Sequence, residues 1–289
     1  MNYRQKTLSA CLLGIAALVA GAAPAFAATS APSLGTASSF AVLSAAPGGG
    51  GAVTCTDSII TGDVGSSGAA ASVVQTSCTI LGAIIAPVSA GVLADFNSAY
   101  DALAGQSCDQ FLTGTLAGVT LTPGVYCFAA AATLTGTLTL DGPSTGTWLF
   151  KIGTSGTGAL TGTDFSVALV NGASACNVTW WVAEAATMTR GDFKGTILAG
   201  AAITGTGVAP TSPFEGRALA KAAVTLTNSA FLGCTGGSIG GTAKPKCNQG
   251  VGNGPEGCDP GNSNQGNPFH SNDELGGVPG DPGRKGGNK

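Results

Sequence analysis

The stretch Thr133-Leu-Thr-Gly-Thr-Leu-Thr-Leu140 places threonine at every odd position and leucine or glycine at every even position. Successive side chains of a β-strand point to opposite faces, so this pattern puts hydroxyls on one face and leucines on the other. Threonine is β-branched and stiff at χ1, which favours extended backbone. The stretch therefore predicts a strand with a hydroxyl-bearing outer surface.

Short pieces of the same kind recur along the chain. They are Thr113-Gly-Thr115, Thr154-Ser-Gly-Thr157, Thr161-Gly-Thr163, Thr204-Gly-Thr206 and Thr225-Leu-Thr227. Any one of them is compatible with an ordinary solvent-facing strand of another β fold. Their recurrence favours stacked coils, in which each coil adds one strand to a shared face.

The composition points in the same direction. Only 9% of the 289 residues are charged, against roughly a quarter in an average globular domain, and there are 47 glycines. Helix surfaces need charge, so β structure with tight turns is favoured. The formal charge of -3 excludes a general nucleic-acid binder. The single histidine, His270, excludes a histidine-based triad and a multi-histidine metal site.

The N-terminus has the pattern of a secretory signal peptide. Arg4 and Lys6 form a basic start, an apolar run covers 11–21, and Ala25-Phe-Ala27 is an A-x-A-type cleavage site. We predict cleavage after Ala27, so that residues 1–27 are removed and the mature protein is secreted without a membrane span.

The mature chain retains an even number of cysteines, for which disulfides are the default in an exported protein. Eight cysteines permit 105 connectivities, so the sequence leaves the pairing open. No C-x-x-C is present, so a zinc site is not expected. Sequence proximity favours Cys55–Cys78, Cys108–Cys127 and Cys247–Cys258, which leaves Cys176–Cys234 by elimination.

One segment has helical rather than strand periodicity. Val92, Phe96, Ala99 and Leu103 fall on one face of a helix within 87–106, and Gly105 is a plausible stop. An apolar stripe of this kind predicts a helix lying along the β body.

The remainder divides into one domain and a tail. Residues 28–243 are long enough for a single domain with a substantial core. Residues 244–289 begin with a cysteine-containing loop and continue as a Gly, Pro and Asn-rich stretch that is predicted to be disordered.

Several segments, in order, resemble the bacterial and fungal ice-binding protein family, whose domain was first catalogued as one of unknown function. They are Leu34-Gly-Thr-Ala-Ser-Ser-Phe-Ala-Val-Leu43, Ile60-Thr-Gly-Asp-Val-Gly65, the helix, Leu121-Thr-Pro-Gly-Val-Tyr126, Leu134-Thr-Gly-Thr-Leu-Thr-Leu-Asp-Gly142, Trp148-Leu-Phe-Lys-Ile-Gly153, Val170-Asn-Gly-Ala-Ser-Ala-Cys-Asn-Val178, Gly195-Thr-Ile-Leu-Ala199 and Gly216-Arg-Ala-Leu-Ala220. The resemblance implies a mainly β fold: an irregular right-handed β-helix of triangular section, with one long α-helix alongside and a closing coil built from both ends of the chain.

The resemblance also implies adsorption to ice through a threonine-rich face with a loosely repeated Thr-(Ala/Gly)-x-(Thr/Asn) pattern. That pattern is partly present here, because Thr161-Gly-Thr-Asp164 ends in a charge. A shortened coil is expected to bring Arg190, Asp192 and Lys194 towards the same face. The candidate ice contacts are Thr135, Thr137, Thr161, Thr163, Thr189, Thr204 and Thr206.

The implied partner is the ice crystal surface, bound by a monomer without cofactor or metal. The alternative is a non-enzymatic adhesion or structural protein that binds a cell-surface or matrix polymer. A flat, uncharged threonine face would favour the first hypothesis, and a face broken by charges would favour the second.

An enzyme is disfavoured because the acidic residues are scattered rather than clustered. Those considered are Asp141, Asp164, Glu184, Asp192 and Glu215. Trp148, Trp180 and Trp181 are expected in the core rather than on a sugar-binding platform.

Overall fold

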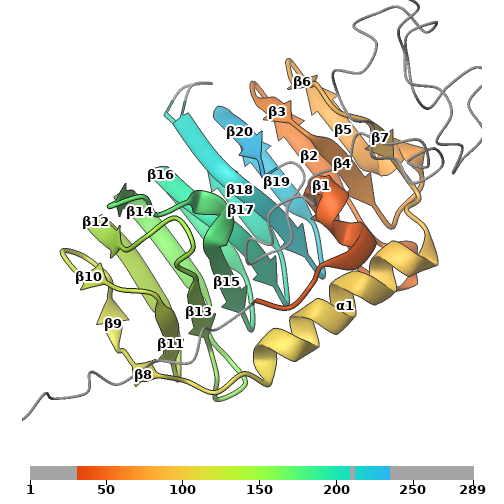
Figure 1. Ribbon diagram of the computed structural model, residues 1–289. Helices are drawn as coiled ribbons and strands as arrows, with labels where there is room; N and C mark the ends of the chain where they lie inside the picture. The colour runs from red at the N-terminus through yellow and green to blue at the C-terminus, as the bar shows by residue number, and fades with distance from the viewer. Residues whose placement is uncertain (1–30, 209–211, 235–289) are drawn as a thin grey trace, which may run out of the picture.

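The structure is a computed structural model that describes residues 31–208 and 212–234. Its strands pair in parallel and stack as coils of a β-helix, with a single long α-helix along one side (Figure 1). Each coil contributes to three faces, which we call the helix-covered face, the threonine face and the third face. The predicted β-helix with one α-helix packed alongside is confirmed.

The helix-covered face is the most apolar of the three, because both of its sides are buried. Val178–Val182, for example, is buried at every position, as expected for a parallel strand covered on both sides. Its strands, in stacking order, are β8 (Gln110–Phe111), β11 (Gly124–Phe128), β13 (Trp148–Ile152), β15 (Val178–Val182), the ends of β16 (Ala186–Ala199) and β18 (Ser212–Ala220), β1 (Phe40–Ser44), β4 (Asp63–Ser66) and β7 (Ile84–Ile85).

The threonine face alternates outward polar residues with inward buried ones, and solvent lies on its outer side. Its strands are β9 (Gly114–Thr115), the starts of β12 (Ala132–Asp141), β14 (Leu160–Val170) and β16, then β17 (Ile203–Thr206), β19 (Val224–Thr227), β2 (Val53–Thr56) and β5 (Val73–Thr76).

The third face follows the threonine face in each coil. Its strands are β10 (Thr120–Leu121), the later parts of β12 and β14, the middle of β16, the start of β18, then β20 (Ser229–Gly233), β3 (Ile59–Thr61) and β6 (Thr79–Ile80). A short 3-10 turn at Gly35–Ser39 precedes β1, and others connect successive strands at Pro47–Gly49, Ala70–Ser72 and Ala175–Asn177.

Helix α1 (Ala90–Ala104) begins and ends close to the predicted limits. The Ser89 hydroxyl accepts a hydrogen bond from the Val92 amide, and Gly105 is the C-cap residue. The predicted stripe of Val92, Phe96, Ala99 and Leu103 is buried against the helix-covered face. Beyond the last turn, the ammonium of the buried Lys151 donates to the carbonyls of Ala104 and Gln106, which neutralises the negative end of the helix.

The helix sets the order of the stack. It carries the chain from the coils formed by 40–85 to the far end, from which later coils wind back (Figure 1). Consequently β18 pairs with β1, β19 with β2 and β20 with β3. The C-terminal strands β18, β19 and β20 thus form the coil that stacks on the N-terminal coil of β1, β2 and β3. The resemblance implied such a joining of the two ends of the chain.

Aromatic rings fill the interior as a continuous file along the stack. Phe150 stacks on Trp180 with ring centroids 3.9 Å apart, and Phe214 stacks on Phe231 at 4.2 Å. Tyr126 and Phe193 complete the file. Trp148, Trp180 and Trp181 are all buried, as predicted. A tightly packed interior of this kind holds each strand at a fixed height and makes the outer faces regular.

Three disulfides join neighbouring parts of the stack. They are Cys55–Cys78, Cys108–Cys127 and Cys176–Cys234, which agree with the pairing favoured by the sequence. The predicted Cys247–Cys258 pair lies outside the described residues, as do the signal peptide and the tail.

Candidate functional site

The Thr-x-Thr pieces of successive coils lie in register on the threonine face. Thr161 pairs with Thr187, Thr187 with Thr204, and Thr204 with Thr225. The result is two files of threonines running up the stack. The first file consists of Thr115, Thr133, Thr161, Thr187, Thr204, Thr225 and Thr54, and the second of Thr163, Thr189, Thr206, Thr227, Thr56 and Thr76.

The residue between the two threonines of each coil points inward and is buried. Cys55, Met188 and Leu226 occupy this position in three coils. Gly162 occupies it where Phe165 and Met188 already fill the interior, because a Cβ there would lie 2.6 Å from Phe165 Cε1 and 2.8 Å from Met188 Sδ. The choice of inner residue therefore compensates for the local core and keeps the outer threonines level.

The two files set the spacing of the surface. Strands of one sheet lie about 4.8 Å apart and alternate residues of one strand about 6.6 Å apart, so hydroxyls and methyls form a rectangular array. Within 31–208 and 212–234, the hydroxyls of Thr161, Thr187, Thr204 and Thr225 make no hydrogen bond to the protein. They are therefore available to water.

The side of the array beyond the second file is a corner where the chain turns onto the third face. Asp164 and Arg190 occupy this corner with φ of 49° each, the left-handed region. The Arg190 guanidinium donates two hydrogen bonds of 2.7 Å to the Asp164 carboxylate. These bonds lower the pKa of Asp164 and raise that of Arg190. The two charges neutralise each other at the margin of the array.

The expectation that Arg190, Asp192 and Lys194 share the threonine face is wrong for two of the three. The left-handed turn at Arg190 places Asp192 and Lys194 on the third face, where β16 pairs with β14 and β18. Lys194 Nζ lies 2.8 Å from Asp192 and 3.2 Å from Glu215. Burial lowers the pKa of Lys194, but the hydrogen bonds to these carboxylates outweigh burial and raise it. The threonine files themselves contain no charge.

Five of the predicted contacts lie together in the array: Thr161, Thr163, Thr189, Thr204 and Thr206. Thr135 lies at the corner before Gly136, and its hydroxyl is 3.0 Å from that of Thr115. Thr137 lies on the third face opposite Ser166. The stretch 133–140 is thus not one flat strand, because Gly136 takes φ of 67° and divides it between two faces.

Several members of the array are not among the predicted contacts. Thr187 lies in Thr187-Met-Thr189, and Thr54 and Thr56 flank Cys55, so the Thr-x-Thr signal was present in both places. The resemblance implied a coil built from both ends of the chain, but it did not show that Thr54 lies beside Thr225.

The other candidate groups have structural contacts. Asp141 accepts a hydrogen bond from Asn171, and Glu184 accepts one from the Gly158 amide. Within the described ranges, no group of three or more His, Cys, Asp or Glu side chains is placed to hold a metal ion.

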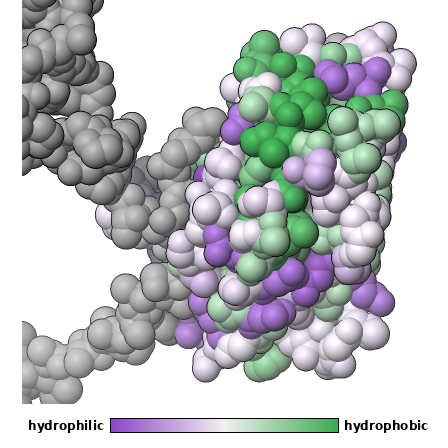
Figure 2. All heavy atoms as spheres, turned by 90° about the vertical axis from the view of Figure 1, so that its right-hand side faces the viewer, coloured by the Kyte–Doolittle hydropathy of each residue, from purple (hydrophilic) through white to green (hydrophobic). Residues whose placement is uncertain are grey.

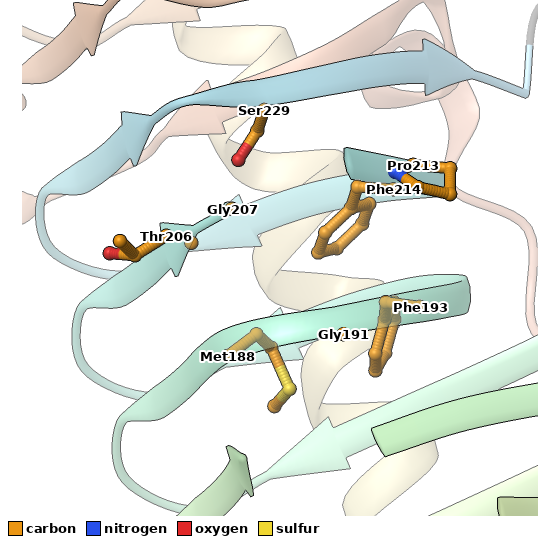
Figure 3. A pocket seen from close by; sticks show the side chains of 9 residues that line it. Met188, Gly191, Phe193, Thr206, Gly207, Pro213, Phe214 and Ser229 are labelled. Carbon is orange, nitrogen blue, oxygen red and sulfur yellow. The ribbon is translucent and has the colours of Figure 1, made fainter. Parts of the chain in front are cut away.

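One small cavity lies behind the second file. It measures about 20 Å³, which is room for about one water molecule, and Met188, Phe193 and Phe214 contribute to its lining (Figure 3). Two larger open hollows, of about 200 Å³ beside Tyr126 and about 290 Å³ beside Ile59, lie elsewhere on the described surface. In 31–208 and 212–234, no helix has the length and apolar composition needed to cross a membrane.

The geometry therefore defines a parallel β-helix with two uncharged, in-register files of threonines on one face. The family model described as ice-binding-like matches residues 47–231, and the chain belongs to this family. An ice-binding protein of Nostoc sp. (strain HG1) is 40% identical over 211 residues, which are 70% of this chain and 74% of that protein. An ice-binding protein of Flavobacterium frigoris (strain PS1) is 32% identical over 67% of this chain and 73% of the relative.

Solved structures agree with the sequence comparison. The crystal structure of an ice-binding protein from the Antarctic ascomycete Antarctomyces psychrotrophicus superposes with a TM-score of 0.61 at 31% identity, covering 71% of this chain and 98% of that one.

Proposed function

We propose that this protein binds ice through the threonine face. The observation that carries the proposal is the pair of in-register threonine files, which presents hydroxyls and methyls at constant spacing over successive coils. Family membership supports it, since the relatives are named ice-binding proteins.

Ice binding by this face would depend on the ordering of water by threonine hydroxyls and threonine methyls. Threonine hydroxyls donate and accept hydrogen bonds, and the methyls between them hold water at a distance without competing for it. A charged side chain would orient water around itself instead. The absence of charge from the two files supports ice adsorption over the alternative of an adhesion protein, and the charges of Arg190 and Asp164 at the margin of the array neutralise each other.

Export and the lack of an enzymatic role belong to the same proposal. The N-terminal signal pattern and the three disulfides support a secreted protein, which would act on extracellular ice. The contacts made by Asp141, Glu184 and Lys194 give these groups structural roles and support a non-enzymatic protein.

The test is the ice activity of the purified, oxidised protein. We expect the parent protein to inhibit ice recrystallisation and to produce thermal hysteresis, and Thr161→Tyr and Thr206→Tyr to lose most of both, because a bulky ring breaks the level surface. Melting curves and circular dichroism should show that both variants remain folded. A parent protein without activity would exclude ice binding and leave adhesion as the hypothesis to test.

A further inference from the structure

The end of the stack formed by 73–85, which we call the end coil, exposes apolar side chains. Leu81 is 67% exposed, Val74 48% and Ile84 45%, and Ile85 and the neighbouring Ile59 are also exposed. Figure 2 looks onto this end and shows hydrophobic residues gathered on it. Most of the large exposed hydrophobics within the described residues belong to this one region.

The same end offers unpaired backbone. Among the described strands, β5 pairs only with β2, β6 only with β3 and β7 only with β4, so their outer N–H and C=O groups have no partner strand. Open strand edges attract other strands, and natural sheets protect them with charges, proline or bulges. Here the sequence has no Asp, Glu, Lys or Arg from 64 to 94.

The opposite end of the stack is different. Its strands β8, β9 and β10 carry polar side chains such as Gln110, Thr115 and Thr120, and Asp109 precedes them. Phe111 is its single large exposed hydrophobic residue among those described. Apolar exposure and the absence of charge therefore coincide at the end coil alone.

We propose that the end coil is the interface of an isologous dimer with a second copy of this chain. A two-fold axis brings a patch against itself, so net charge on the patch would repel; residues 73–85 of the end coil carry none, and the exposed Asp57 lies at the margin beside Ser77 and Thr79. Asp63, which flanks it, accepts a 2.8 Å hydrogen bond from the Ala83 amide. The proposal replaces the expectation of a monomer.

The chain's own C-terminal segment, residues 235–289, fits the exposed edge of the end coil less well than a second copy of the chain does. Residues 235–289 contain no two adjacent large apolar residues, and acidic and basic side chains are scattered through them. Such a segment cannot supply the apolar strand that an uncharged edge requires.

The symmetry fixes which strands meet. A two-fold axis normal to the threonine face at the outer edge of β5 pairs β5 antiparallel with its copy and sets β6 against β7 of the second molecule. Val74 and Thr76 end the two threonine files in β5. The threonine faces of the two copies would then lie in one plane. That this plane would present a doubled ice-binding surface rests on the proposed function.

The experiment is light scattering after size exclusion on the full mature, oxidised protein over a dilution series. We expect twice the monomer mass for the parent protein. Leu81→Lys and Ile84→Lys place like charges across the axis and should raise the dissociation constant about a hundredfold or more. Phe111→Lys, equally exposed at the opposite end, should leave the mass unchanged.

A parent protein that is monomeric at every concentration would overturn the proposal. So would a dimer that survives both end-coil substitutions, or one that Phe111→Lys dissociates. Melting curves establish that the variants are folded. The molar mass is measured without ice, so the two proposals are tested separately. A monomeric protein would leave the ice-binding proposal standing. A protein without ice activity would leave the dimer proposal to the light-scattering result.

Discussion

The threonine face and the third face are outer surfaces of the same coils, built over the same aromatic interior, yet only one is regular. On the threonine face the coils that begin at Thr161, Thr187, Thr204, Thr225 and Thr54 repeat Thr-x-Thr with a buried residue between the threonines. On the third face the strands of these coils carry Asp192, Lys194 and Glu215, and the exposed Leu232. The comparison teaches that the fold supplies strand spacing to every face, while the side chains decide which face can order water.

The largest effect should come from a charge placed in the middle of the array. Thr187→Lys lies in the first file between Thr161 and Thr204, and we expect it to remove most ice recrystallisation inhibition, since an ammonium orients water around itself. Ser166→Lys places the same charge on the third face, and its activity should equal that of the parent protein. Equal loss in both variants would show that the two faces do not differ in function.

A change beneath the surface tests whether the threonines must be level. Gly162→Leu forces side-chain atoms into space held by Phe165 and Met188, and overpacking of this kind costs typically about 1–3 kcal/mol. We expect chemical denaturation to show that loss and ice activity to fall, although no threonine is altered. Gly91→Ala, at an exposed helix position where a Cβ would meet only Ser89 Oγ at an ordinary contact distance of 3.7 Å, should stabilise the protein by up to about 1 kcal/mol and leave ice activity unchanged. Full ice activity in Gly162→Leu would mean that small displacements are tolerated.

Extending the array should give a modest gain. Val74 continues the first file beyond Thr54, so Val74→Thr adds one hydroxyl in register. We expect a small increase in thermal hysteresis at equal concentration. Ile59→Thr adds a hydroxyl to the third face and should give none, and a gain there instead would reverse the assignment of the face.

The smallest effect should be that of pH, because the threonine files do not titrate. The neighbouring Asp164 has a pKa below its ordinary value, owing first to its hydrogen bonds from Arg190. The ion pair is therefore intact above the usual aspartate range and is lost as pH falls through the lowered pKa. Ice activity should be constant from about pH 5 to 9. A change of several-fold within that range would implicate charged groups in binding.

Local patterns predicted much of this fold. The stripe of Val92, Phe96, Ala99 and Leu103 gave α1, and three of the cysteine pairs followed from proximity and elimination. The sequence of motifs also pointed to the β-helix. These features depend on residues near one another in the chain or on the order of segments.

The site was harder to predict because it depends on backbone turns and on distant strands. The alternation in 133–140 groups Thr137 with Thr133 and Thr135, and nothing in it shows that Gly136 turns the chain so that Thr137 lies on the third face. Thr54 and Thr225 are far apart in sequence and adjacent in space only because α1 crosses the stack. Register between such strands is set by the whole fold.

The most direct test of the central claim is the partition of the folded protein into slowly growing ice, measured for Thr204→Tyr and Thr137→Tyr beside the parent protein. Both substitutions replace a threonine of β-helix strands with the same ring, one in the middle of the threonine face and one on the third face. We predict that the Thr204 variant is excluded from ice while the Thr137 variant is incorporated as the parent protein is. Incorporation of the Thr204 variant, or exclusion of the Thr137 variant, would contradict the assignment of ice binding to the threonine face.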